Sequence, residues 1–209
     1  RSAVAFLRLA CGDDPSRWPR LDWLGEHPVG PVLDILRQRI NSPLTSSCGR
    51  LFDAVAALTG RWAESGYEAQ AAMEFMALAD PAQLAKADVW HDAMSADDPD
   101  REPLVIPVGG LVRAAAEAVA AGVSPAVISA RFHRTLAGML VAAVIRISRA
   151  TGLQDVVLAG GVFQNELLLV EVEEALSAAS LQPLRPQLLP PGDGALAVGQ
   201  AVVAARSVG

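Results

Sequence analysis

The chain has 209 residues, 17 basic and 23 acidic side chains, a net charge of −6 and 52% hydrophobic residues. This length suffices for one large or two small domains, and the acidic balance argues against nucleic acid as the main partner because phosphate neutralisation needs clustered Lys and Arg. No apolar run reaches the roughly 18 residues that a membrane span requires. Cys11 and Cys48 offer neither a disulfide framework nor metal spacing, so we expect a cytoplasmic protein without a membrane partner.

Helical periodicity dominates the first hundred residues. Apolar spacing predicts helices over residues 2–11, 30–40 and 67–79, and a further helix that begins after Ser46 or Ser47 and ends at Gly60. The expected core stripes are Val32, Leu36 and Ile40 in the second helix, and Leu51, Phe52, Val55 and Leu58 in the helix after the serines.

The stretch "SADDPDREP", residues 95–103, is charged, holds two prolines and lacks apolar periodicity. Such composition is typical of a linker. The sequence therefore predicts two domains: a helical segment at 1–94 and an α/β lobe at 103–209.

Strand and helix signals alternate after this linker. We expect strands at 104–108, 155–160 and 184–190, and helices at 109–121, 164–178 and at the end of "PPGDGALAVGQAVVAA". A long helix should run between Ser124 and Gly152, with a stripe of Ile128, Phe132, Leu136, Leu140 and Ile147. The order of elements predicts parallel strands joined by right-handed crossovers.

Two glycine-rich turns follow predicted strands. In "LAGGVFQN", Gly160 and Gly161 could bring bare peptide groups against a ligand at the carboxyl end of the strand, or simply make a tight turn before Asn165 caps a helix. In "PPGDG", Asp193 could cap the last helix or ligate a metal.

Three further side chains allow two interpretations each. Asp53 could accept hydrogen bonds from a ribose or be a solvated residue beside the stripe. Cys48 could be a nucleophile near a helix start or a small buried hydrophobe. His133 follows Phe132 on the long helix, so we expect it at the edge of the core in a structural role.

Five stretches together resemble the C-terminal part of the HypF family of hydrogenase maturation carbamoyltransferases. They are "INSPLTSSCGRLFDAVAAL", "GYEAQAAMEF", "ISARFHRTLA", "LAGGVFQNELLL" and "PPGDGALAVGQAVVAA". The resemblance implies part of a sugar-kinase/Hsp70/actin-like (ribonuclease H-like) domain: helix-rich α/β, with a short parallel or mixed sheet flanked by helices. That domain is related to the tRNA threonylcarbamoyl transferases and the antibiotic O-carbamoyltransferases.

The resemblance also implies a chemistry. An upstream domain of such enzymes converts carbamoyl phosphate and ATP to carbamoyl-adenylate. The C-terminal domain binds this adenylate and passes the carbamoyl group to the C-terminal Cys of a HypE-like acceptor protein, which leads to the cyanide ligands of [NiFe] hydrogenase.

Site residues follow from the same resemblance. It places Asp53 at the ribose, Gly160, Gly161 and Asn165 at the nucleotide, and Asp193 at a divalent metal (iron, zinc or magnesium). Gly66, a looser match, would also contact the nucleotide. The family's other metal ligands are an upstream His pair that has no counterpart in this sequence, and no catalytic residue is identified.

The upstream domains of such enzymes are also missing, so we expect a piece of a larger enzyme with little activity alone. Two alternatives stay open: a carbamoyltransferase acting on a small-molecule hydroxyl, and a non-catalytic interaction or regulatory module of the same fold. An apolar face left by the missing lobe would favour a homodimer.

Overall fold

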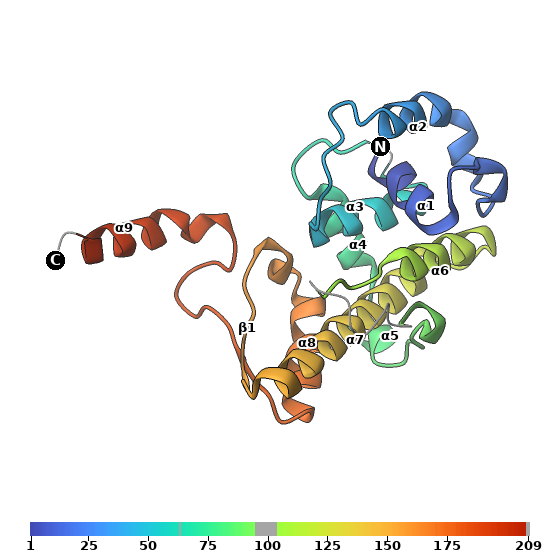
Figure 1. Ribbon diagram of the computed structural model, residues 1–209. Helices are drawn as coiled ribbons and strands as arrows, with labels where there is room; N and C mark the ends of the chain where they lie inside the picture. The colour runs from blue at the N-terminus through green and yellow to red at the C-terminus, as the bar shows by residue number, and fades with distance from the viewer. Residues whose placement is uncertain (63, 95–103, 208–209) are drawn as a thin grey trace. The chain divides into compact units, whose positions relative to one another are not determined.

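The computed structural model describes residues 1–62, 64–94 and 104–207 (Figure 1). The chain divides into two compact units, Arg1–Met139 and Leu140–Gly209, and the division falls within the long helix α7 (Pro125–Thr151). The linker predicted at 95–103 lies outside the described residues, so the domain boundary there stays a prediction.

The first unit is helical. Its elements are α1 (Ser2–Cys11), η1 (Pro15–Arg17), η2 (Asp22–Glu26), α2 (Val29–Arg37), α3 (Cys48–Leu58), α4 (Gln70–Leu78), α5 (Pro81–Leu84), η3 (His91–Met94), α6 (Gly109–Ala120) and the first half of α7. Helix α1 packs against both α3 and α6. The helices predicted in this part of the chain are confirmed, with ends shifted by a few residues.

Aromatic rings from three helices form the centre of this unit. The Phe52 ring lies 4.9 Å from that of Phe132, and the Phe75 ring lies 5.8 Å from the same Phe132, between centroids. Helix α3 buries its predicted stripe of Leu51, Phe52, Val55 and Leu58. The Ser47 hydroxyl accepts a hydrogen bond from the Arg50 amide at 3.4 Å, so Ser47 is the predicted N-cap.

His133 lies inside this aromatic cluster, so the prediction that it sits at the edge of the core is wrong. It is fully buried because Phe52 and Phe75 cover it from two other helices. Its Nδ1 lies 2.7 Å from the Ser129 carbonyl oxygen, an acceptor, so this nitrogen carries the hydrogen. Burial lowers the pKa of His133 to about 4. Its predicted structural role fits this setting.

The second unit is a small α/β structure. After α7 come β1 (Asp155–Val157), η4 (Gly161–Gln164), α8 (Glu166–Ala178), β2 (Gln182–Leu184), η5 (Asp193–Ala195) and α9 (Leu196–Ser207). The two strands are parallel, with Val156 opposite Pro183, as predicted. Helix α8 connects them and packs against β2, and it buries Leu168, Val172 and Leu176.

Several predicted elements differ from the structure. Residues 104–108 form no strand; Pro107 removes one N–H donor from the run, and the described strands β1 and β2 pair with each other. The second strand lies at Gln182–Leu184 rather than 184–190, since Pro186 interrupts the later run. Helix α2 buries Leu33, whereas Ile40 is 50% exposed because α2 ends at Arg37. In α7, Ile147 is 48% exposed, outside the core stripe.

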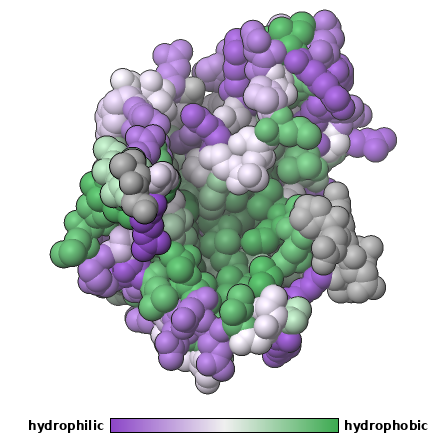
Figure 2. All heavy atoms as spheres, turned by 60° about the vertical axis from the view of Figure 1, so that its left-hand side comes forward, coloured by the Kyte–Doolittle hydropathy of each residue, from purple (hydrophilic) through white to green (hydrophobic). Residues whose placement is uncertain are grey.

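Apolar side chains also remain at the surface. Within residues 196–207, no side chain of α9 is buried, and Val202 and Val203 are more than half exposed. Figure 2 shows exposed apolar residues in green. Helix α7 is long and apolar enough to cross a membrane by length and composition alone, although 56% of its most apolar window is buried and core helices meet the same criterion.

Candidate functional site

The two glycine-rich turns lie against each other at the carboxyl ends of the strands. The Leu158 amide donates to the Leu184 carbonyl at 2.8 Å and extends the ladder, and the Gly160 amide then donates to the Pro191 carbonyl at 2.6 Å. A Cβ atom at Gly192 would stand 3.1 Å from the Gly161 Cα. The parallel pairing brings the turns together because both follow the same edge of the sheet.

Gly160 and Gly161 differ in why they are glycines. Gly160 has φ +101°, a conformation that L side chains rarely adopt. Gly161 does not have positive φ, and a Cβ added there would meet no atom within 4 Å. The protein's own packing therefore leaves open space at Gly161. A ligand that approaches the peptide closely would need such space.

Asn165 caps α8. Its Oδ1 accepts a hydrogen bond from the Leu168 amide at 3.0 Å, which confirms the capping interpretation. The nucleotide contact implied for Asn165 stays a prediction. A cap on this helix also fixes the position of the Gly160–Gly161 turn, because the turn leads directly into α8.

Asp193 is exposed at the start of η5, and the N-cap position is Gly192, with no side-chain cap bond. Asp193 lies three residues before α9, so the cap of the last helix expected from it stays a prediction. Within residues 1–62, 64–94 and 104–207, no three His, Cys, Asp or Glu side chains gather as a metal site would require. A single carboxylate does not fit a complete divalent-metal site.

Asp53 and Gly66 belong to the first unit. The Asp53 side chain is 24% exposed, and its Oδ2 accepts a hydrogen bond from Arg50 Nη1 at 3.0 Å. This partner defines its orientation at the edge of the α3 stripe. Gly66 is exposed, and its amide donates to Gln70 Oε1 at 2.7 Å. The ligand contacts implied for both residues stay predictions.

Cys48 is partly buried at the first position of α3. Burial raises its pKa to about 11, so the thiol is protonated near neutral pH. A protonated thiol is a poor nucleophile, and the interpretation of Cys48 as a packing residue is the better one.

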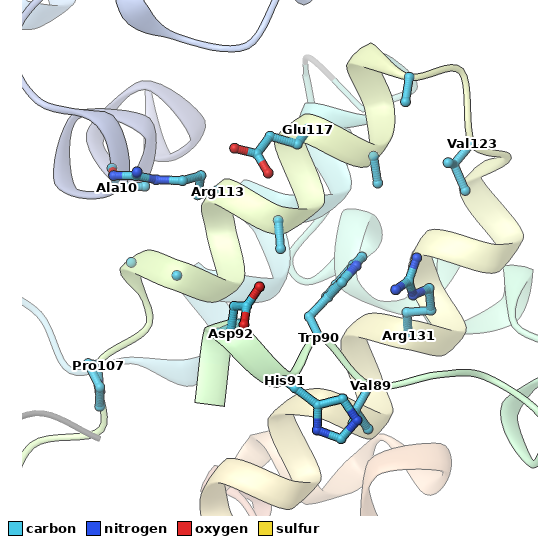
Figure 3. A pocket seen from close by; sticks show the side chains of 16 residues that line it. Ala10, Val89, Trp90, His91, Asp92, Pro107, Arg113, Glu117, Val123 and Arg131 are labelled. Atoms are coloured by element: carbon cyan, nitrogen blue, oxygen red, sulfur yellow. The ribbon is translucent and has the colours of Figure 1, made fainter. Parts of the chain in front are cut away.

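A cavity of about 1030 Å³ in the first unit was not expected from the sequence (Figure 3). The Arg131 guanidinium lies 5.0 Å from the centroid of the Trp90 ring, and Arg113 and Glu117 lie on α6 at the opposite wall. Arg113 donates to the Ala10 carbonyl. These charges come from segments far apart in the chain, so no local motif identifies them.

Comparison with known proteins gives one consistent match. The family described as carbamoyltransferase, Kae1-like domain, second subdomain, matches residues 1–200. The chain is 35% identical to carbamoyltransferase HypF of Rhizobium leguminosarum bv. viciae, over 100% of this chain and 25% of that protein. It is 37% identical to a carbamoyltransferase HypF homolog of Cupriavidus necator, over 88% of this chain and 46% of that protein.

Solved structures agree with this match. A crystal structure of full-length HypF in the phosphate- and nucleotide-bound form superposes with a TM-score of 0.83 and 28% identity, over 99% of this chain and 26% of that one. The chain thus spans between a quarter and a half of the length of these similar proteins.

Proposed function

Since the chain belongs to the HypF carbamoyltransferase family, as the second subdomain of the Kae1-like domain, we propose that it binds carbamoyl-adenylate and takes part in carbamoyl transfer to a protein thiol. The resemblance and the fold class predicted from the sequence are confirmed by the same matches. The observation that carries the proposal is the pair of turns at the carboxyl ends of parallel strands: Gly192 approaches the Gly161 backbone, and a Cβ at Gly161 would itself meet no atom within 4 Å.

Nucleotide binding is the first part of the proposal. Glycine turns at this edge of a parallel sheet suit a ligand that approaches the peptide closely. The similar full-length HypF structure holds phosphate and nucleotide, which supports the same ligand class here. Asp53 would accept hydrogen bonds from the ribose hydroxyls, and Gly66 and Asn165 would complete the nucleotide contacts.

Carbamoyl transfer is the second part. The acceptor thiolate attacks the carbamoyl carbon of the adenylate, the new C–S bond forms, and the bond from that carbon to the phosphate oxygen breaks, so that AMP leaves. The domain contributes by holding the adenylate in position for this attack. The acceptor would be a HypE-like protein with a C-terminal Cys, and the product would serve cyanide ligand synthesis for [NiFe] hydrogenase. Carbamoyl phosphate and ATP would be the source of the adenylate.

The residues present do not by themselves fit a divalent-metal site. Asp193 is one carboxylate, and among the described residues it belongs to no group of three His, Cys, Asp or Glu side chains that could hold a metal ion. We therefore assign no step to a divalent ion. The cytoplasmic location and the homodimer also stay predictions. Sedimentation over a wide concentration range would test the homodimer.

Two measurements test the proposal. Calorimetry with ATP and AMP should show binding to the chain. Because the chain spans about a quarter of full-length HypF proteins, transfer is tested with the upstream part of such an enzyme present, and mass spectrometry should then detect a carbamoyl group on a Cys-terminated acceptor peptide. Absence of both binding and transfer would favour the non-catalytic module. Carbamoylation of a small-molecule hydroxyl in place of the thiol would favour the O-carbamoyltransferase.

A further inference from the structure

Gln164 lies where the two glycine turns meet. It is the last residue of η4, and its Nε2 atom is 3.2 Å from the position that a Cβ at Gly192 would take. The side chain therefore reaches from the first turn across to the second. The same position is 3.1 Å from the Gly161 Cα, so the Gln164 amide and the Gly161 backbone both lie next to Gly192.

The amide of Gln164 is available to a ligand. The residue is exposed, and no hydrogen bond joins its side chain to any residue within 1–62, 64–94 or 104–207. While water solvates the side-chain amide of Gln164, the missing protein partner does not destabilise the fold. A ligand can take the place of that water and form the same hydrogen bonds.

We infer that Gln164 is a specificity-determining residue that recognises the adenine base of the nucleotide. This inference rests on the proposed function. A glutamine amide offers one acceptor beside two donors, and adenine presents an N–H donor beside a ring-nitrogen acceptor, so the two groups form a bidentate pair. Phosphate offers acceptors alone and would match peptide N–H groups or arginine better.

Replacement of the amide should change which base is bound. Gln164→Ala removes both hydrogen bonds, so the affinity for ATP should fall about tenfold or more while the affinity for GTP changes little. Gln164→Glu replaces the amide by a carboxylate, which has two acceptor oxygens and no donor. A carboxylate can accept from two donors on guanine but faces the ring-nitrogen lone pair of adenine, so the preference should move from ATP toward GTP.

Calorimetric titration of the 209-residue chain with ATP and with GTP measures this preference. Gln154→Ala is the matched control, because Gln154 is an exposed glutamine of the same unit at the amino end of β1; its ATP-to-GTP affinity ratio should equal that of the parent. Thermal melting of each variant would confirm folding, and the exposed position of Gln164 predicts little change.

Two failures are distinguishable. Suppose that the parent chain binds ATP and that both Gln164→Ala and Gln164→Glu keep the parent's ratio of ATP affinity to GTP affinity. This result would overturn the role of Gln164 and leave the proposed function intact. Parent chain that binds neither nucleotide would overturn the proposed function, and the inference with it.

Discussion

Gly192 approaches Gly161 so closely that a Cβ at residue 192 would stand 3.1 Å from the Gly161 Cα and 3.4 Å from its amide nitrogen. The reverse does not hold, because a Cβ at Gly161 would meet nothing within 4 Å. This asymmetry separates a glycine that the packing of the turns requires from one that the packing leaves open.

Gly192→Ala should therefore destabilise the second unit. The methyl group must push the backbone of the first turn aside, and overpacking of this kind costs about 1–3 kcal/mol. Urea unfolding followed by circular dichroism measures the change. Gly199→Ala on α9 is the control, because a Cβ there, unlike one at Gly192, meets nothing within 4 Å; it should raise stability by up to about 1 kcal/mol, since Ala favours a helix interior over Gly. Equal stability of the two variants would show that the turns separate freely.

Gly161→Val should leave the fold intact and weaken nucleotide binding. The side chain would occupy the open space beside the peptide and block a close approach by the ligand. Calorimetry with ATP and a melting curve of the same variant make the comparison. Normal ATP affinity in a folded Gly161→Val chain would mean that the turn is structural only.

Asp53→Ala should weaken ATP binding about tenfold, because a carboxylate that accepts from the ribose is lost and a hydrogen bond to a charged group contributes roughly 1.5–3 kcal/mol. Asp34→Ala is the matched control: Asp34 also pairs with an arginine three positions away on a helix, at 3.1 Å, and nothing assigns it to the ligand. A similar loss of affinity in both variants would point to net charge rather than to a ribose contact.

Local sequence patterns predicted much of this structure. The N-cap Ser47, the buried α3 stripe and the strand that leads to Gly160 and Gly161 all depend on residues close together in the chain. The position of Gln164 beside Gly192 could not be predicted in this way, because it depends on a contact between two turns separated by α8.

Burial of His133 was missed for the same reason. Helical spacing correctly placed it beside Phe132, but the rings that cover it, Phe52 and Phe75, come from α3 and α4. The strand expected at 104–108 is absent although Pro183 is tolerated in β2, an edge strand. Apolar content alone does not show whether a run finds a strand to pair with. Pairing partners and covering side chains are tertiary properties, and periodicity alone does not contain them.

His133 should make the protein less stable in acid. Burial lowers its pKa in the folded chain to about 4 from the ordinary value of 6.5, so the unfolded chain binds more protons between these two pH values. Stability is then unaffected by this group above pH 6.5 and falls as the pH drops from 6.5 toward 4, by about 3 kcal/mol at most, because each unit of pKa shift corresponds to about 1.4 kcal/mol. Urea unfolding at a series of pH values measures the slope. His133→Gln, which can still donate an N–H inside the cluster, should lose stability at neutral pH but show a flatter dependence across this range. An unchanged slope in that variant would assign the acid sensitivity to other groups.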